Sequence, residues 1–368
     1  MKRSQRLMAV TIITSAALLS AACGSSSGDA TSSSPAATAG GGSSSAAPSL
    51  SGSLTFVNWG GDSLNAAKQG WLEPFTAETG VTFQTDSPGD QAKVKAMVES
   101  GNVTWDVIDY DVSAAGDACG TLYEKRPADF DISQIDPKYI SDDCGVPIIA
   151  QTVALVYNAE KFGDNPPTSI TDFMDTSKYP GKRIIFNYWT GSAEPLLMAD
   201  GVAADDLFPI DWDRLFAIKD KLGSDLVFQA GLDQQVQAQE SGDFALCLCY
   251  LGRSAVAAQN GAQIGVVWSE TFDAWDGLYV VKGTKNPDAA WAFSQWLATP
   301  EGQAGYSQYL AYSPTTVGGE APAVPEEFKG FMSAFNKDKI QETGFMDAKW
   351  WAANVAEASD QWAKLTAG

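Results

Sequence analysis

Short apolar runs and amphipathic segments alternate along the chain from residue 53 onward. Residues 54–59, 81–85 and 105–109 are apolar runs of strand length. Between the first two, residues 62–80 repeat their apolar positions at helical spacing and end at Gly80, a helix stop signal. Strands and helices that alternate with short connections predict parallel pairing in an α/β sheet.

The same alternation continues beyond residue 150 and predicts a second α/β unit. Further apolar runs of strand length occupy residues 154–157, 183–186, 226–229, 244–250 and 264–268. A chain of 368 residues is also long enough for about two domains of ordinary size. The fold class expected is therefore α/β with two units.

The first 52 residues have no such pattern and are interpreted as an export signal followed by a flexible tether. Residues 1–22 combine three basic side chains with an apolar run at 7–19, as in a signal peptide, and that run is short for a membrane span. Cys23 follows small residues and resembles the lipidated cysteine of bacterial lipoproteins. Residues 24–52 are mostly Ser, Gly and Ala and cannot form a core. The alternative is an ordinary secreted protein with an unrelated cysteine.

Charge and composition exclude several function classes. The formal net charge is −21, which disfavours nucleic-acid binding because phosphates need clustered Lys and Arg. The chain contains no histidine, and this removes Ser-His-Asp catalysis and every histidine-containing metal site. No metal and no cofactor is expected. An acidic protein of this kind is compatible with a cationic ligand.

Four cysteines remain beyond the predicted leader and Cys23, and export favours disulfides. Cys119 and Cys144 flank a polar stretch and are expected to pair. Cys247 and Cys249 alternate with leucines in a predicted strand, so their side chains point to one face about 6.6 Å apart. Parallel side chains make poor disulfide geometry, and two free buried thiols are therefore expected.

A series of motifs, in this order and spacing, resembles the extracellular solute-binding proteins of ABC importers, and among them the spermidine/putrescine-binding branch. The motifs are at residues 56–59, 71–80, 105–108, 143–147, 178–182, 251–255, 275–278 and 299–302. The resemblance covers most of residues 53–368. It implies two lobes that close on a solute like a Venus flytrap, with the chain crossing between them. Lobe 1 is expected at 53–152 plus 277–317, and lobe 2 at 153–276 plus 318–368.

The same resemblance implies a function. The protein would capture a small amine such as spermidine or putrescine and deliver it to a membrane permease with its ATPase subunits. It would act as a monomer, held by its lipid anchor on the outer face of the cytoplasmic membrane. An alkylammonium ligand needs aromatic faces for its methylenes and carboxylates for its N–H donors.

Candidate pocket residues are therefore aromatic and acidic, and the resemblance implies that Asp276 holds the ammonium group. Asp62 is equally able to cap a helix, and Asp111, like Asp109, to begin one. The candidate ligand-binding residues are Trp59, Asp62, Asp111, Trp189, Glu194, Tyr250, Arg253, Trp275, Asp276, Tyr312 and Trp351.

Arg253 leaves a second ligand class open. A guanidinium facing the cleft would repel a diamine and bind a carboxylate bidentately, which favours an amino-carboxylate such as an ω-amino acid. A salt bridge at the surface or between lobes is the alternative role for Arg253. Two other classes stay open: a sensor lipoprotein of the same fold, and an extracellular hydrolase using paired carboxylates such as Asp142 and Asp143.

Overall fold

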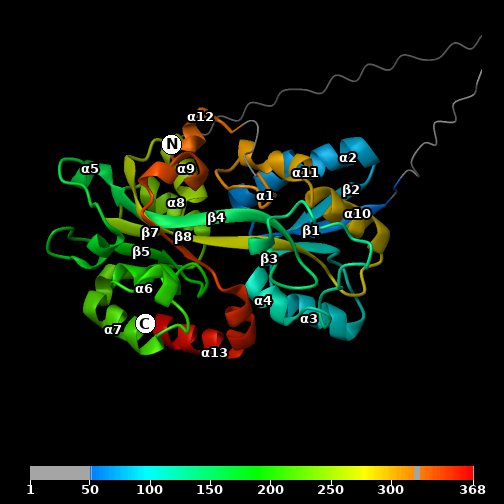
Figure 1. Ribbon diagram of the computed structural model, residues 1–368, viewed down its shortest axis with the longest axis horizontal. Coiled ribbons are helices and arrows are strands. Elements are labelled where there is room, and N and C mark those ends of the chain that lie inside the picture. The colour runs from blue at the N-terminus through cyan, green and yellow to red at the C-terminus, as the bar shows by residue number, and fades with distance from the viewer. Residues whose placement is uncertain (1–49, 51, 319–323, 368) are drawn as a thin grey trace, which may run out of the picture. The chain divides into compact units, whose positions relative to one another are not determined.

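Nine strands form one mixed sheet in the computed structural model, which describes residues 50, 52–318 and 324–367 (Figure 1). The predicted signal peptide, Cys23 and the tether up to residue 49 lie outside the described residues. The described strands pair in the order β2-β1-β3-β8-β4-β7-β5-β6, and β9 pairs with β8. Their bounds are β1 Ser53–Val57, β2 Thr82–Asp86, β3 Val107–Asp111, β4 Val146–Asn158, β5 Arg183–Phe186, β6 Leu226–Gln229, β7 Leu246–Tyr250, β8 Ile264–Val280 and β9 Glu342–Phe345.

The sheet has two halves joined by two long strands. In the first half β1 pairs in parallel with β2 and β3, and in the second half β5 pairs in parallel with β6 and β7. These pairings confirm the predicted α/β class. The long strands β4 and β8 run antiparallel to each other through the middle, and β3 and β7 pair antiparallel with them.

The sequence pattern predicted only part of the two long strands. The run at 154–157 is the last part of β4, which has 13 residues, and the run at 264–268 is the first part of β8, which has 17. Their remaining residues include polar side chains such as Gln151, Glu270 and Asp273. Pairing with a neighbouring strand holds these polar stretches extended, although they lack the apolar alternation of a strand.

Helices cover both faces of the sheet (Figure 1). Helices α1, α2, α8, α9 and α11 lie on one face, and α3, α4, α6, α7 and α13 lie on the other. A π-helical turn, Lys68–Leu72, joins α1 to α2 within the helix predicted over 62–80. The helices are α1 Gly61–Ala67, α2 Glu73–Thr79, α3 Gln91–Ser100, α4 Val112–Asp117, α5 Ala159–Phe162, α6 Ala193–Ala199, α7 Trp212–Leu222, α8 Leu232–Glu240, α9 Leu251–Gln259, α10 Pro287–Leu297, α11 Pro300–Ala304, α12 Glu326–Lys329 and α13 Ala348–Thr366.

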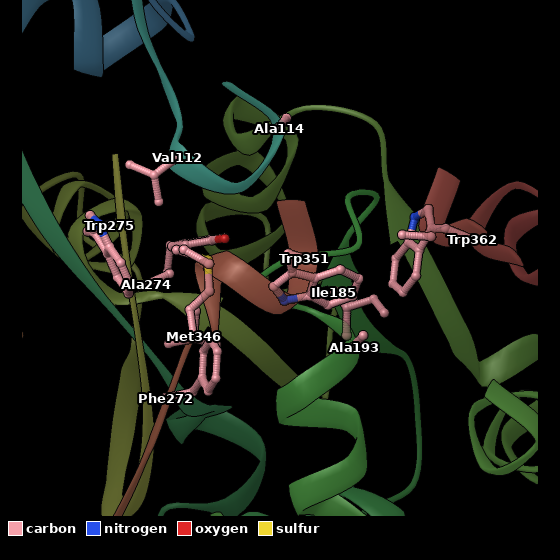
Figure 2. Packing of buried hydrophobic residues seen from close by; sticks show 14 of the residues in the cluster. Val112, Ala114, Ile185, Ala193, Phe272, Ala274, Trp275, Met346, Trp351 and Trp362 are labelled. Atoms are coloured by element: carbon pink, nitrogen blue, oxygen red, sulfur yellow. The ribbon is translucent and has the colours of Figure 1, made fainter. Parts of the chain in front are cut away.

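Helix α13 packs against both α4, which follows the first-half strand β3, and α7, in the second half. Its Trp351 is fully buried in the cluster that Figure 2 shows, near Ile185 of β5 and Ala193 of α6. On the opposite face a separate apolar cluster contains Trp71, whose ring stacks on Tyr306 with 4.4 Å between centroids. The predicted lobe boundaries, which assign 318–368 to lobe 2, stay a prediction.

Two disulfides connect the four described cysteines. The predicted Cys119–Cys144 pair is confirmed, with 5.6 Å between Cα atoms. The expectation of free thiols at Cys247 and Cys249 is wrong, since the structure joins them in a second disulfide. Their Cα atoms lie 5.2 Å apart, closer than in an untwisted strand and within the range that a disulfide spans.

No helix within the described part of the chain is long and apolar enough to cross a membrane.

Candidate ligand-binding site

A cavity of about 20 Å³ lies between the two halves, where β1 and β3 of the first half and β7 of the second half end beside β8. Trp59 follows β1, Asp111 ends β3, Tyr250 ends β7, and Trp275 and Asp276 lie in β8. The carboxyl ends of parallel strands meet at one edge of a sheet, which brings these predicted residues together. The other lining residues, which were not among the candidates, are Gln151, Phe186, Tyr188, Leu232 and Ala274.

Asp276 is a lining carboxylate whose protein hydrogen bonds all go to one oxygen. Its Oδ2 accepts one hydrogen bond from the Trp59 indole Nε1 at 2.9 Å and another from Gln151 Nε2 at 2.7 Å. No donor within the described residues contacts Oδ1. Burial raises the pKa of Asp276 to about 7, and the Asp111 charge adds to this, while the two hydrogen bonds act in the opposite direction. A cation at Oδ1 would stabilise the ionised form.

Aromatic rings line the wall beside this carboxylate. The Trp59 ring stacks on Tyr110, with 5.1 Å between centroids and an interplanar angle of 8°. Tyr188 meets Trp59 edge to face at 5.7 Å and stacks on Trp189 at 4.4 Å. Such faces attract ammonium groups and pack against methylenes.

Asp111 lines the cavity but its oxygens are already used by the protein. Oδ1 accepts from the backbone N–H groups of Ser113 and Ala114 at 2.8 and 3.0 Å, and so caps α4. Oδ2 accepts the Thr190 hydroxyl at 2.5 Å, which links the first half to the loop after β5. Burial raises the pKa of Asp111, and these hydrogen bonds oppose the rise. Asp111 therefore has a structural role whether or not it also contacts a ligand.

Asp109 is buried behind this site, two residues earlier in β3. Neither carboxylate oxygen has a hydrogen-bond partner among the described residues. Burial and the charge of Asp276 raise its pKa well above the usual value, so the neutral form is favoured.

Arg253 lies near the start of α9, three residues after Tyr250 of the cavity wall, and its side chain is only 2% exposed. Its Nη1 lies 3.5 Å from Asp62 Oδ2 of α1 and 3.6 Å from Asp233 Oδ1 of α8. These are ion pairs without hydrogen-bond geometry, and Nε and Nη1 find no acceptor in the described chain. A buried guanidinium with unmet donors is costly unless an acceptor completes it.

Tyr312 lies beside Arg253 and outside the cavity lining. Its ring packs over Gly252, where an added Cβ would overlap it, and stacks on Tyr306. Burial raises the pKa of Tyr312 to about 12, against a lowering by the charge of Arg253, and the Asp276 carboxylate adds to the rise. Both charged groups therefore act on this hydroxyl, which places them within electrostatic reach of one region.

Two further candidates, Glu194 and Trp351, contact each other instead of the cavity. Glu194 Oε1 accepts the Trp351 indole N–H at 2.7 Å, and Oε2 accepts the Gly191 backbone N–H at 2.9 Å. Burial raises the pKa of Glu194 to about 8. This pair ties α13 to α6 in the core, and Trp189 likewise lies behind the lining residue Tyr188.

The fold and the site together define a class of protein. A sheet in two halves joined by two long strands, with an acidic and aromatic cavity at the strand ends, is the architecture of the two-lobed periplasmic binding proteins. Residues 70–329 match the family model of bacterial extracellular solute-binding proteins. The chain belongs to this family, whose members are the substrate-binding components of ABC importers, and the family is a transport family with an extracytoplasmic location.

The chain is similar to a protein and a solved structure that are named for one ligand. It is 32% identical over 281 residues to the gamma-aminobutyric acid-binding protein of Pseudomonas aeruginosa PAO1, covering 74% of this chain and 79% of the relative. A solved GABA receptor is 32% identical, with a TM-score of 0.76 over 86% of this chain and 98% of its own.

Other solved structures extend the comparison. An Agrobacterium tumefaciens R10 binding protein in complex with agropinic acid is 25% identical, with a TM-score of 0.73 over 85% of this chain and 98% of its own. The spermidine/putrescine-binding protein of Streptococcus pneumoniae is 19% identical, with a TM-score of 0.62 over 85% and 98% of the two chains. That last likeness shows the fold alone, so the importer family is confirmed and the polyamine branch is not.

Proposed function

We propose that this substrate-binding protein captures an ω-amino acid of the size of γ-aminobutyrate. Asp276 would bind the ammonium group and Arg253 the carboxylate. The protein would then present the closed complex to its permease. The lipid anchor at Cys23 and the monomeric state remain predictions from the sequence.

The observation that carries this proposal is the incomplete coordination of Arg253. Its guanidinium is buried, and its Nε and Nη1 have no hydrogen-bond acceptor in the described residues. A carboxylate accepts two parallel N–H bonds from a guanidinium, either from Nε with Nη2 or from Nη1 with Nη2, and each of these pairs contains one of the two unmet donors. A diamine has no group that could accept them.

The ammonium end of the ligand is supported by Asp276 and the aromatic wall. Oδ1 of Asp276 accepts no hydrogen bond within the described residues and is available to an N–H donor. The rings of Trp59 and Tyr188 line the same cavity and would pack against the methylenes of the ligand. The names of the two relatives at 32% identity agree with a ligand that has one ammonium and one carboxylate.

The cavity is smaller than such a ligand. A volume of about 20 Å³ is close to the space for one water molecule. Ligand entry therefore requires side chains to move or the two halves to separate, and hinge motion is the usual motion of two-lobed binding proteins. Closure would then bring Arg253 and Asp276 onto opposite ends of the ligand.

A polyamine is the second candidate, because the site is rich in acids. Asp109, Asp111 and Asp276 lie close to one another on β3 and β8. Two of them are poorly suited to bind a cation, however. Asp111 caps α4 with one oxygen, and burial raises the pKa of Asp109 so that its neutral form is favoured. This leaves Asp276 as the carboxylate that is open to a cation in the cavity.

Isothermal titration calorimetry with γ-aminobutyrate, δ-aminovalerate and putrescine tests the proposal. We expect both ω-amino acids to bind more tightly than putrescine. Arg253→Ala should weaken the amino acids by at least 100-fold, since a charge-assisted bidentate contact is lost, and should leave putrescine unchanged or tighter. Arg214→Ala is the matched control, because Arg214 forms a partly exposed salt bridge with Asp200. Tighter binding of putrescine by the unmodified protein would contradict the proposal.

A further inference from the structure

Arg253 lies between two carboxylates from different halves of the molecule. Asp62 is in the first turn of α1 in the first half, and Asp233 is in the first turn of α8 in the second half. Both helices lie on the same face of the sheet as α9 (Figure 1). Gly61 lets the two halves approach here, because a Cβ at that position would overlap the Asp233 carboxylate.

The oxygens of Asp62 and Asp233 can accept further hydrogen bonds. Asp62 is 39% exposed and Asp233 is 62% exposed at the side chain. Within the described residues neither accepts a hydrogen bond, and each meets Arg253 through one oxygen only. They are therefore open to further N–H donors from a ligand.

The charges around Arg253 favour a ligand carboxylate that has an ammonium group beside it. One guanidinium already faces two carboxylates within 3.6 Å of Nη1. A ligand carboxylate alone would bring a third negative charge to one positive charge, a repulsion that the exposure of Asp62 and Asp233 only partly screens. A ligand with an ammonium group next to its carboxylate adds no net charge there and supplies the donors that Asp62 and Asp233 lack.

We propose that the preferred ligand is an α,ω-diamino acid, whose α-ammonium is bound by Asp62 and Asp233. Its α-carboxylate meets Arg253 and its ω-ammonium meets Asp276. The inference rests on the proposed function and narrows its substrate class to amino acids with net charge +1. It also accounts for an acidic site that contains one buried guanidinium.

The position of the acid pair relative to the cavity supports this arrangement. Leu232, next to Asp233 in α8, lines the cavity, and so does Tyr250 at the start of α9. A ligand that spans from Asp276 to Arg253 therefore places its α-carbon on the side of the site where Asp62 and Asp233 lie.

Calorimetry with a matched ligand pair tests the inference. 2,4-Diaminobutyrate is γ-aminobutyrate with an added α-ammonium, and ornithine stands in the same relation to δ-aminovalerate. We expect the diamino acid of each pair to bind about tenfold more tightly, the value of one partly exposed charge-assisted contact. Asp62→Asn/Asp233→Asn should remove this preference, weakening the diamino acids while γ-aminobutyrate binds as before or more tightly.

Asp205→Asn/Asp338→Asn is the control, since it removes two exposed carboxylates that form no ion pair with Arg253 and should keep the preference. The ligand comparison in the unmodified protein needs no variant, and so it stays decisive if the double variant folds poorly. Equal or tighter binding of γ-aminobutyrate overturns the diamino acid inference and leaves the proposed function standing. A preference that survives Asp62→Asn/Asp233→Asn overturns the role of the acid pair. Binding of neither amino acid overturns the proposed function itself.

Discussion

At Asp276, burial and hydrogen bonding act on the pKa in opposite directions. Burial raises the pKa to about 7, even though Trp59 and Gln151 both donate to Oδ2. The free protein therefore holds this side chain partly protonated near neutral pH. A ligand ammonium binds only the carboxylate form, so ligand binding and proton release are linked.

This linkage predicts a pH dependence of affinity. Below pH 7 a proton has to leave Asp276 before the ammonium binds, and above pH 7 none does. We expect the Kd for γ-aminobutyrate to be about tenfold higher at pH 6 than at pH 8, measured by calorimetry. Asp276→Asn should weaken binding by about 10- to 100-fold and remove the pH dependence. Asp205→Asn should change neither, and a Kd that is flat from pH 6 to 8 in the unmodified protein would contradict the prediction.

At the scale of helices and strands, a few side-chain hydrogen bonds and a disulfide fix the positions of helices and loops relative to the sheet. The Glu194–Trp351 hydrogen bond ties α13 to α6, and Asp111 links the start of α4 to Thr190. The Cys119–Cys144 disulfide closes a segment of sequence separation 25 between α4 and β4, a stretch rich in turns. Much of this segment has no sheet pairing, so the crosslink limits its freedom in the unfolded chain.

Removing that disulfide should destabilise the protein measurably. A loop of this length corresponds to about 3.5 kcal/mol of unfolding free energy in the chain-entropy description. We expect Cys119→Ala/Cys144→Ala to lose about that amount in urea unfolding under non-reducing conditions. Cys247→Ala/Cys249→Ala is the control, since its pair closes a loop of separation 2 and should lose less. A larger loss from the control pair would mean that loop closure is not the main contribution.

At the scale of the whole molecule, the charges proposed to bind the ligand come from distant parts of the chain. Asp62, Asp233 and Arg253 come from three helices, while Asp276 comes from a central strand. A ligand held by all of them would favour the closed arrangement of the two halves. For an importer component we expect this closed form to be the species offered to the permease, and the predicted anchor would keep it near the membrane.

The anchor is a prediction from residues 1–23 alone. A growing culture fed a labelled fatty acid should incorporate the label into the protein, because Cys23 follows a signal peptide and small residues. Cys23→Ser should abolish the label, and the Cys119→Ala/Cys144→Ala variant should retain it. Continued labelling of Cys23→Ser would remove the lipoprotein interpretation and leave the binding function untouched.

The sequence pattern predicted the first-half strands because each is a short apolar run between clear turn signals. It missed most of β4 and β8, whose polar residues are held extended by neighbouring strands. It also missed the Cys247–Cys249 disulfide, because the argument assumed an untwisted strand and the Cα atoms lie closer than that. The pattern of apolar and polar residues in one segment predicts only which of its own side chains are buried. The full lengths of β4 and β8 and the geometry of the Cys247–Cys249 pair depend on the strands beside them.

The sequence by itself determined the α/β class, the absence of histidine chemistry and, through the order of its motifs, the resemblance to the solute-binding family, which in turn implied an aromatic and acidic site. These follow from composition, periodicity and ordered motifs, all of which are properties of the chain read in one dimension. Only the tertiary structure decided which candidates meet. It placed Asp276 against Trp59 and Gln151, turned Glu194 and Trp351 toward each other, and set Arg253 between Asp62 and Asp233. The physical reason is that burial and partner charge are set by residues far apart in the chain, such as Trp59 and Asp276, which are 217 positions apart.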